Sequence, residues 1–192
     1  MKRVNEIFRS LQGEGYWTGR AAVFVRFSGC NLRCRFCDTD HGAGVLMGDE
    51  EIARLAAEGG TGFVVLTGGE PALQADGPLV AALHARGLTV AIETNGTRRL
   101  PEGIDWVTYS PKWEFSDGAE PQIARADELK VVWTGQDVEH HLDFPAQHYF
   151  LQPCDWGDAE RNRESLAACV AYVETHPRWR LSVQMHKLIG VR

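Results

Sequence analysis

The chain has 192 residues, of which 44% are hydrophobic and 24% are charged, a composition typical of one globular domain with its own core. Its net charge of −6 argues against broad binding to a nucleic-acid backbone, which needs clustered positive charge. The chain shows no apolar signal core and no run of about 20 apolar residues, so we expect a cytoplasmic protein without a membrane partner.

Short apolar runs alternate with amphipathic stretches, which is the pattern of an α/β fold with a parallel sheet. The apolar runs predict strands at residues 21–27, 63–66, 88–92, 105–109, 128–133, 149–151 and 181–183. The amphipathic stretches predict helices at residues 49–57, 78–86 and 160–176. Segment 111–127 shows no clear period and is predicted to be a loop. Since a full eightfold barrel needs about 250 residues, we expect a partial, open barrel forming a single domain over residues 1–192.

Polar segments follow nearly every predicted strand directly. In chain order they are Ser28–Cys30, Thr67–Pro71, Glu93–Gly96, Ser110–Lys112, Gln152–Pro153 and Gln184–Lys187. In parallel α/β sheets and barrels, sites form at the carboxyl ends of the strands. We therefore expect these segments to converge on one face of the sheet.

Three cysteines lie within eight residues, with the spacing C-x3-C-x2-C. They are Cys30, Cys34 and Cys37, and the aromatic Phe36 precedes the last of them. Thiolates are the usual ligands of a 4Fe-4S cluster, and three of them leave one iron open to chelate a small molecule. The spacing resembles the signature of the radical S-adenosylmethionine (SAM) enzymes, in which SAM binds the open iron.

Cysteines can also form disulfides, bind zinc or simply fill a core. Five cysteines in 192 residues are too sparse for a disulfide framework, and their number is odd. A structural zinc site needs four ligands, usually as two separated pairs, and this sequence has no second pair. His41, four residues after Cys37, is the candidate for a fourth ligand. Cys169 falls on the apolar face of a helical pattern and is predicted to be a buried small hydrophobe, and Cys154 taken alone has the same interpretation.

Two glycine-containing segments could approach a ligand. Thr67–Pro71 reads Thr-Gly-Gly-Glu-Pro, and its glycines let the backbone come close to a bound group, although a plain turn has the same composition. Following the cysteine loop, it resembles the Gly-Gly-Glu motif that holds the SAM amino group. Leu11–Gly15 reads Leu-Gln-Gly-Glu-Gly, which composition alone does not distinguish from a polar turn.

Charged residues at two further places could bind a ligand. Arg26 alternates with Val25 and Phe27 in the first predicted strand, so it is either an exposed edge arginine or an inward clamp for a carboxylate. Asp38 and Asp40 follow the last motif cysteine, where they could bind a hard cation or cap the loop.

Taken in order, these motifs span almost the whole chain and closely resemble the 7-carboxy-7-deazaguanine synthase family. The resemblance implies a reduced barrel of about six parallel strands with few helices, and a homodimer. It implies a carbon–nitrogen lyase that converts 6-carboxy-5,6,7,8-tetrahydropterin to 7-carboxy-7-deazaguanine with loss of ammonia. This reaction serves queuosine biosynthesis, a tRNA-modification pathway. The implied cofactors are a 4Fe-4S cluster, SAM and Mg²⁺, with an electron donor such as flavodoxin or ferredoxin.

The resemblance also assigns roles to residues. Cys30, Cys34 and Cys37 hold the cluster, and Thr39 rather than either neighbouring aspartate binds Mg²⁺. The residues implied to contact SAM are Arg35, Phe36, Asp38, Gly69, Glu70, Ser110, Pro111, Lys112, Gln152, Pro153, Cys154 and Asp155. The residues implied to contact the pterin are Leu11, Gln12, Gly13, Glu14, Arg26, Thr67, His186 and Arg192.

Two other functions compete with this one. A glycyl-radical activating enzyme shares the cysteine motif, but the Leu11–Gly15 segment and the aspartates after Cys37 argue against it. A non-catalytic zinc or iron–sulfur module is the alternative from another class, and metal content would separate it from an enzyme.

Overall fold

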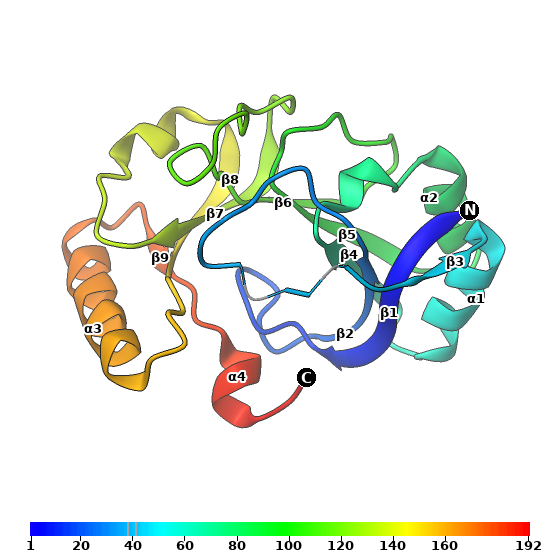
Figure 1. Ribbon diagram of the computed structural model, residues 1–192, viewed down its shortest axis with the longest axis horizontal. Coiled ribbons are helices and arrows are strands. Elements are labelled where there is room, and N and C mark those ends of the chain that lie inside the picture. Colours follow the sequence, from blue (N-terminus) through cyan, green and yellow to red (C-terminus); the bar gives the residue numbers. More distant parts are fainter. Residues whose placement is uncertain (38, 41) are drawn as a thin grey trace.

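A curved mixed sheet forms the framework of the molecule, as the computed structural model in Figure 1 shows. The structure describes residues 1–37, 39–40 and 42–192. In these residues nine strands pair in the order β3-β1-β2-β4-β5-β6-β7-β8-β9. The strands are β1 (Lys2–Leu11), β2 (Ala21–Phe27), β3 (Val45–Met47), β4 (Phe63–Gly68), β5 (Thr89–Thr94), β6 (Trp106–Tyr109), β7 (Ala126–Trp133), β8 (Ala146–Pro153) and β9 (Arg180–Leu181). The helices are α1 (Asp49–Glu58), α2 (Gly77–His84), α3 (Ala159–Thr175) and α4 (Met185–Ile189), with short 3-10 turns η1 (Pro71–Leu73) and η2 (Glu139–Asp143).

From β2 to β9 along the sheet, neighbouring strands are parallel, and β4 to β9 follow β2 in chain order. The sheet does not close, because no pairing joins β3 to β9 within the described parts of the chain. The predicted partial barrel is therefore confirmed. The residue pattern did not predict the antiparallel strands β1 and β3 at its edge.

Two apolar cores lie on the outer side of the sheet. One packs α1 and α2 against β2, β4 and β5, and it contains Val25, Leu66 and Ile92. The other packs α3 against β8, with Cys169 and Leu151 fully buried, as predicted for this cysteine. In Figure 1 these helices cover opposite flanks of the sheet.

The inner side of the sheet changes character along the strands. Side chains alternate between faces, so Phe63, Val65 and Thr67 of β4 share the inner face. The first two belong to an inner apolar cluster with Phe24 of β2, whereas Thr67 lies at the carboxyl end and lines a cavity. The amino-terminal half of the barrel is thus filled with apolar groups, and its carboxyl end is open and polar.

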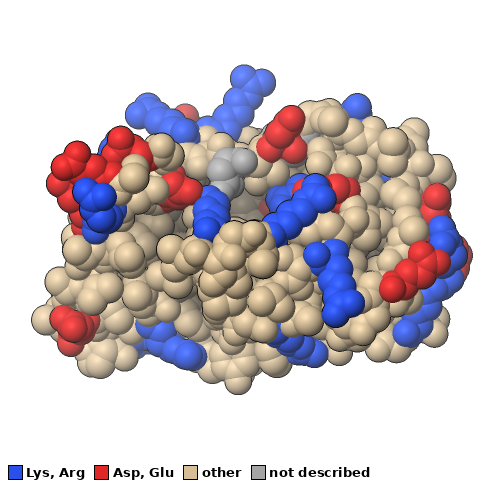
Figure 2. Space-filling model, turned by 90° about the horizontal axis from the view of Figure 1, so that it is seen from below, with Lys and Arg blue, Asp and Glu red and all other residues tan. Residues whose placement is uncertain are grey.

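Charges of both signs are distributed over the surface. On the face drawn in Figure 2, basic and acidic side chains are interspersed and do not gather in one patch of a single sign. Among the described helices, none is long and apolar enough to cross a membrane.

Candidate active site

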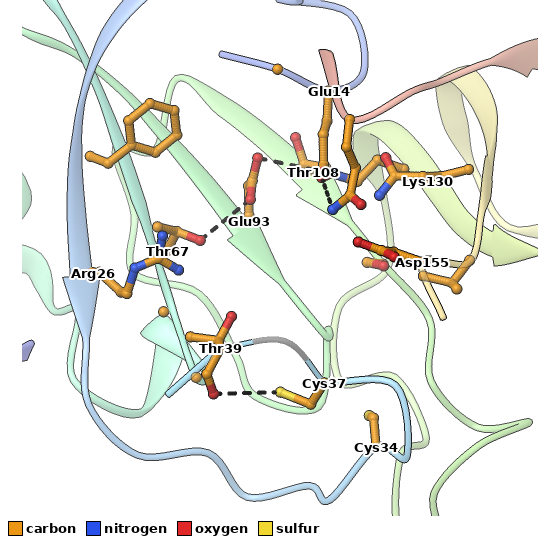
Figure 3. Close-up of a pocket in the computed structure, with 18 of the residues that line it drawn as sticks. Glu14, Arg26, Cys34, Cys37, Thr39, Thr67, Glu93, Thr108, Lys130 and Asp155 are labelled. Carbon is orange, nitrogen blue, oxygen red and sulfur yellow. Dashed lines mark hydrogen bonds and ion pairs between the residues drawn. The ribbon is translucent and has the colours of Figure 1, made fainter. Parts of the chain in front are cut away.

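A cavity of about 670 Å³ opens at the carboxyl ends of the parallel strands. The cysteine loop forms one wall, and charged side chains from β2, β5 and β7 form the opposite wall, as Figure 3 shows. The polar segments that follow the strands therefore do converge, as the sequence predicted.

The cysteine loop presents three thiols to this cavity. Cys30 and Cys34 are half-buried and Cys37 is exposed, and all three line the cavity. Burial raises the pKa of the Cys30 and Cys34 thiols. Metal binding at these sulfurs must therefore displace protons.

The glycine turn after β4 packs directly against the cysteine loop. A Cβ atom added at Gly69 would overlap the carbonyl of Gly29 and meet the Cβ of Cys30 at 3.0 Å. Gly68 adopts φ of +129°, which side chains rarely tolerate. Both glycines are required because this turn and the loop share one narrow space.

Glu70 fastens the same turn to the end of β5. Its fully buried carboxylate accepts hydrogen bonds from Ala72 N at 2.9 Å, Thr94 Oγ1 at 2.7 Å and Asn95 N at 2.7 Å. Burial raises the pKa of Glu70 against the effect of these donors. The side chain positions the turn and does not reach the cavity.

Lys112 brings a cation to the cysteine wall. Its ammonium donates to the Ser110 carbonyl at 2.9 Å and also contacts the Ser110 hydroxyl. Burial lowers the pKa of Lys112 to about 8, and the nearby Cys34 opposes this shift.

A hydrogen-bonded network covers the opposite wall. Glu93 Oε1 accepts from Gln12 Nε2 at 2.8 Å, and Glu93 Oε2 accepts from Thr67 Oγ1 at 3.3 Å. Lys130 is ion-paired with Glu14 and lies 3.9 Å from Glu93 Oε1. Burial alone would raise the pKa of Glu14, but Lys130 outweighs it and holds the value at about 2. This network therefore holds two carboxylates and one ammonium in place on the wall.

Arg26 projects from β2 into the cavity, as the inward interpretation requires. Its Nε donates to Glu6 Oε1 at 2.8 Å, and Arg192 pairs with the other oxygen of Glu6. An arginine facing inward from a strand needs an anion, and Glu6 of β1 provides it in this structure. The Arg192 carbonyl also accepts from Ser10, so the last residue lies against the same strand.

The Leu11–Gly15 segment contacts α4. Met185 N donates to the Gly13 carbonyl at 2.9 Å, and Gln184 Nε2 donates to Glu14 Oε1 at 2.9 Å. A Cβ atom at Gly13 would overlap the imidazole of His186. This segment is thus more than a surface turn, because it positions α4 over the cavity.

Most of the predicted site residues line this one cavity. They are Leu11, Gln12, Gly13, Glu14, Arg26, Cys30, Cys34, Phe36, Cys37, Thr39, Thr67, Gly69, Ser110, Lys112, Gln152, Pro153, Cys154, Asp155, His186 and Arg192. Among the described residues, Arg35, Glu70 and Pro111 do not line it. Asp38, a predicted SAM contact, and His41, the candidate zinc ligand, lie outside the described residues.

Comparison with known proteins identifies the family. The model described as the Radical SAM superfamily matches residues 24–111. The 7-carboxy-7-deazaguanine synthase of Bacteroides thetaiotaomicron is 54% identical over 192 residues, covering 100% of both chains. The same enzyme from Nitratidesulfovibrio vulgaris is 47% identical and covers 98% of each chain. The crystal structure of QueE from Escherichia coli matches with a TM-score of 0.77 at 30% identity, covering 96% of this chain and 94% of the other. This chain belongs to the 7-carboxy-7-deazaguanine synthase family.

The 7-carboxy-7-deazaguanine synthases are radical SAM proteins, which implies a 4Fe-4S cluster and SAM. The donor set fits a cluster, since Cys30, Cys34 and Cys37 line one cavity and supply the ligand type that such clusters use. The Gly68–Gly69 turn packs directly against the loop that carries these thiols, at a place where side chains would collide. Membership in this family disfavours both the activating enzyme and the non-catalytic module.

Sequence reasoning missed four charged residues of the cavity lining. They are Glu6, Glu93, Lys130 and Lys187, which take part in its ion pairs although none was among the predicted site residues. The signal for Lys130 was a charge inside a largely apolar strand, where an inward side chain needs a partner. Lys130 could have been found in this way, and Glu93 lies in the polar segment that directly follows a predicted strand.

Proposed function

We propose that this protein converts 6-carboxy-5,6,7,8-tetrahydropterin to 7-carboxy-7-deazaguanine with release of ammonia, in queuosine and 7-deazapurine biosynthesis. The observation that carries the proposal is that one cavity sets three thiols opposite a wall of fixed charges. Family membership over the whole chain supports the same reaction. The chain would act as one domain, since one continuous sheet carries every wall of this cavity.

The cysteine side of the cavity would hold the cofactors. Cys30, Cys34 and Cys37 would bind the cluster, and the Gly69 turn, Lys112 and the residues after β8 would bind SAM beside it. When bound, the reduced cluster and SAM supply hydrogen-atom abstraction. The chain's own share is to orient the substrate and to exclude water from the cavity.

The charged side would hold the pterin. The guanidinium fork of Arg26 suits the substrate carboxylate, which would take the place of Glu6 as its partner. The carboxylates of Glu14 and Glu93 would accept from the N–H groups of the pterin edge. Gln12, Thr67, His186 and Arg192 complete this wall in the proposal.

Thr39 is the proposed magnesium ligand, with substrate oxygens and water filling the rest of the shell. It lines the cavity, and so does Asp40. The Asp40 carboxylate accepts from Gly42 N at 3.0 Å, which is the geometry of a loop cap. Replacing Thr39 with Ala should abolish stimulation of turnover by Mg²⁺, measured as rate against Mg²⁺ concentration. Unaltered stimulation would return the assignment to Asp40 or Asp38.

The proposal also includes a homodimer and a flavodoxin- or ferredoxin-like electron donor. Sedimentation of the purified protein would test the dimer, and replacement of dithionite by each candidate donor would test the reductant.

An anaerobic assay tests the reaction itself. The reconstituted protein is incubated with dithionite, SAM, Mg²⁺ and 6-carboxytetrahydropterin, and the products are read by mass spectrometry. We expect 7-carboxy-7-deazaguanine to form without matching consumption of SAM. Accumulation of 5′-deoxyadenosine alone would mean that the substrate is another molecule.

Variants of the cysteines test the cofactor site. Substituting Ala for any one of Cys30, Cys34 or Cys37 should abolish SAM cleavage, because each supplies a cluster ligand. Cys169→Ala is the matched control, since this thiol belongs to α3 and is buried in the outer core. A motif variant that still cleaves SAM would refute the cluster assignment.

A further inference from the structure

Glu114, His140 and His141 bring three metal-ligating atoms together outside the cavity. These three atoms all lie within 4.8 Å of one another. Nε2 of each histidine is 3.5 Å from Glu114 Oε1. The histidines belong to η2, and Glu114 belongs to the loop between β6 and β7, so the group joins two segments distant in sequence.

His141 is the unusual member, because its side chain is only 1% exposed and neither ring nitrogen has a hydrogen-bond partner. Buried polar atoms are nearly always paired, so two orphaned nitrogens on one ring require an explanation. The Trp113 indole stacks on the imidazole at 5.1 Å and 6°, which fixes the ring plane. Burial lowers the pKa of His141 to about 4, so the ring is neutral near pH 7, the form that binds metals.

Glu114 is also held in place. Its Oε2 accepts from Gln136 Nε2 at 3.0 Å, which leaves Oε1 directed at the histidines. Such a hydrogen bond is the support that ligating carboxylates usually have. The 3.5 Å separations are close to the edge of a zinc tetrahedron, about 3.3 Å for bonds of about 2.0 Å.

We propose that Glu114, His140 and His141 form a second metal site, separate from the cysteine motif, that takes a divalent transition ion of the zinc type. Two imidazoles and one carboxylate suit this class of ion, and the half-exposed His140 leaves the fourth position to water.

The bound ion would fasten the loop that carries Lys112. Glu114 lies two residues beyond Lys112, and Phe115 packs edge-on against Phe36 of the cysteine loop at 4.8 Å. Because η2 is anchored by the fully buried Val138, the ion would tie this loop to the body of the fold. We expect it to stabilise the protein and to hold the wall of the cavity in position.

Zinc content provides the test. Untagged protein loaded with its iron–sulfur cluster is dialysed anaerobically against micromolar Zn²⁺, and zinc and iron are measured together. We expect about one zinc ion per chain with the iron retained, and a melting temperature that rises with Zn²⁺. Absence of bound zinc would overturn the proposal and leave the three residues as ordinary ion pairs.

Two variants locate the ion. His140→Ala and Glu114→Gln each remove one ligand at an accessible position, so neither depends on the buried ring of His141. Each should weaken zinc binding by about tenfold or more and abolish the rise in melting temperature. His84→Ala is the matched control, because this exposed histidine pairs with a single carboxylate, Asp105, at 2.9 Å. Zinc binding that persists in both ligand variants would place the ion elsewhere and refute the site.

Discussion

Arg26 shows how one residue acquires two possible partners. Strand alternation places it on the inner face of β2, and there it forms an ion pair with Glu6 on β1. Glu6 is also paired with Arg192, so it does not depend on Arg26 alone. A substrate carboxylate could therefore replace Glu6 as the partner of the Arg26 guanidinium, while Glu6 stays paired with Arg192.

Substitution of Arg26 with Ala should weaken pterin binding by about 10- to 100-fold, the cost of losing a hydrogen-bonded charge pair. Cleavage of SAM without the pterin should be unchanged, because Arg26 lies on the wall opposite the cysteines. Two quantities are measured for the variant and the unmodified protein: the Michaelis constant for the pterin, and the rate of 5′-deoxyadenosine formation without the pterin. Arg9→Ala is the matched control, since this arginine is exposed on β1. Unchanged pterin affinity in the Arg26 variant would exclude the clamp.

Residue types with strict chemical requirements were predictable from the sequence. The cysteine spacing predicted a cluster site, and the paired glycines predicted a close approach of the backbone. Both predictions were possible because few other residues can ligate iron or fit a turn this tight. Glu70 was not predictable in its actual role. Its position in the motif suggested a ligand contact, and only the fold shows that three protein donors occupy its carboxylate.

At the scale of elements, the segment before β2 and the helix α4 act as one unit. The Gly13 carbonyl accepts from Met185 N, and the space above Gly13 is filled by His186. These contacts hold α4 across the gap between β9 and β1, where Figure 1 shows it.

Gly13→Ala should displace α4 from the cavity, because the added methyl group would overlap the imidazole of His186. Overpacking of this kind costs about 1 to 3 kcal/mol, so we expect kcat/KM for the pterin to fall by about tenfold or more. Gly77→Ala is the control, since nothing lies within 4 Å of the corresponding position at the start of α2. Equal activity of the two variants would show that the position of α4 is unimportant.

Strands were easier to predict than the segments that flank them. The apolar run of β2 was predicted with its observed bounds, Ala21–Phe27, because both of its faces are covered. The strand β1 was missed because its ten residues mix charged and apolar groups and most are only partly buried. With β1 absent from the prediction, Glu6 could not be recognised as the partner of Arg26. The five-residue helix α4 was too short to show a helical period.

At the scale of the whole molecule, an open sheet needs contacts that join its distant parts. Glu14 supplies such a junction, since its carboxylate meets Lys130 on β7 and Gln184 at the start of α4. Lys130 is buried as well, and its pKa is raised because nearby Glu14, Glu93 and Glu128 outweigh the effect of burial. The fold therefore places a buried ion pair at the point where three separate segments meet.

This ion pair predicts how stability depends on pH. The pKa of Glu14 is about 2 in the folded protein and about 4.5 ordinarily, so the unfolded chain binds the proton first as the pH falls. The contribution of Glu14 is then fully present above about pH 5 and is lost progressively toward pH 2, amounting to about 3 kcal/mol. Urea unfolding at pH 7, 5, 4 and 3 should show a steep decline in the free energy of unfolding.

Glu14→Gln isolates this contribution, because the amide has no proton to gain over this range. The variant should be less stable at pH 7, and the difference from the unmodified protein should shrink as the pH falls to 3. Glu102→Gln, at an exposed position between β5 and β6, should leave the curve unchanged. A constant difference between Glu14→Gln and the unmodified protein at every pH would mean that the carboxylate acts only through its shape. The junction between the turn, β7 and α4 would then depend on packing, and the cavity should survive acid conditions that protonate Glu14.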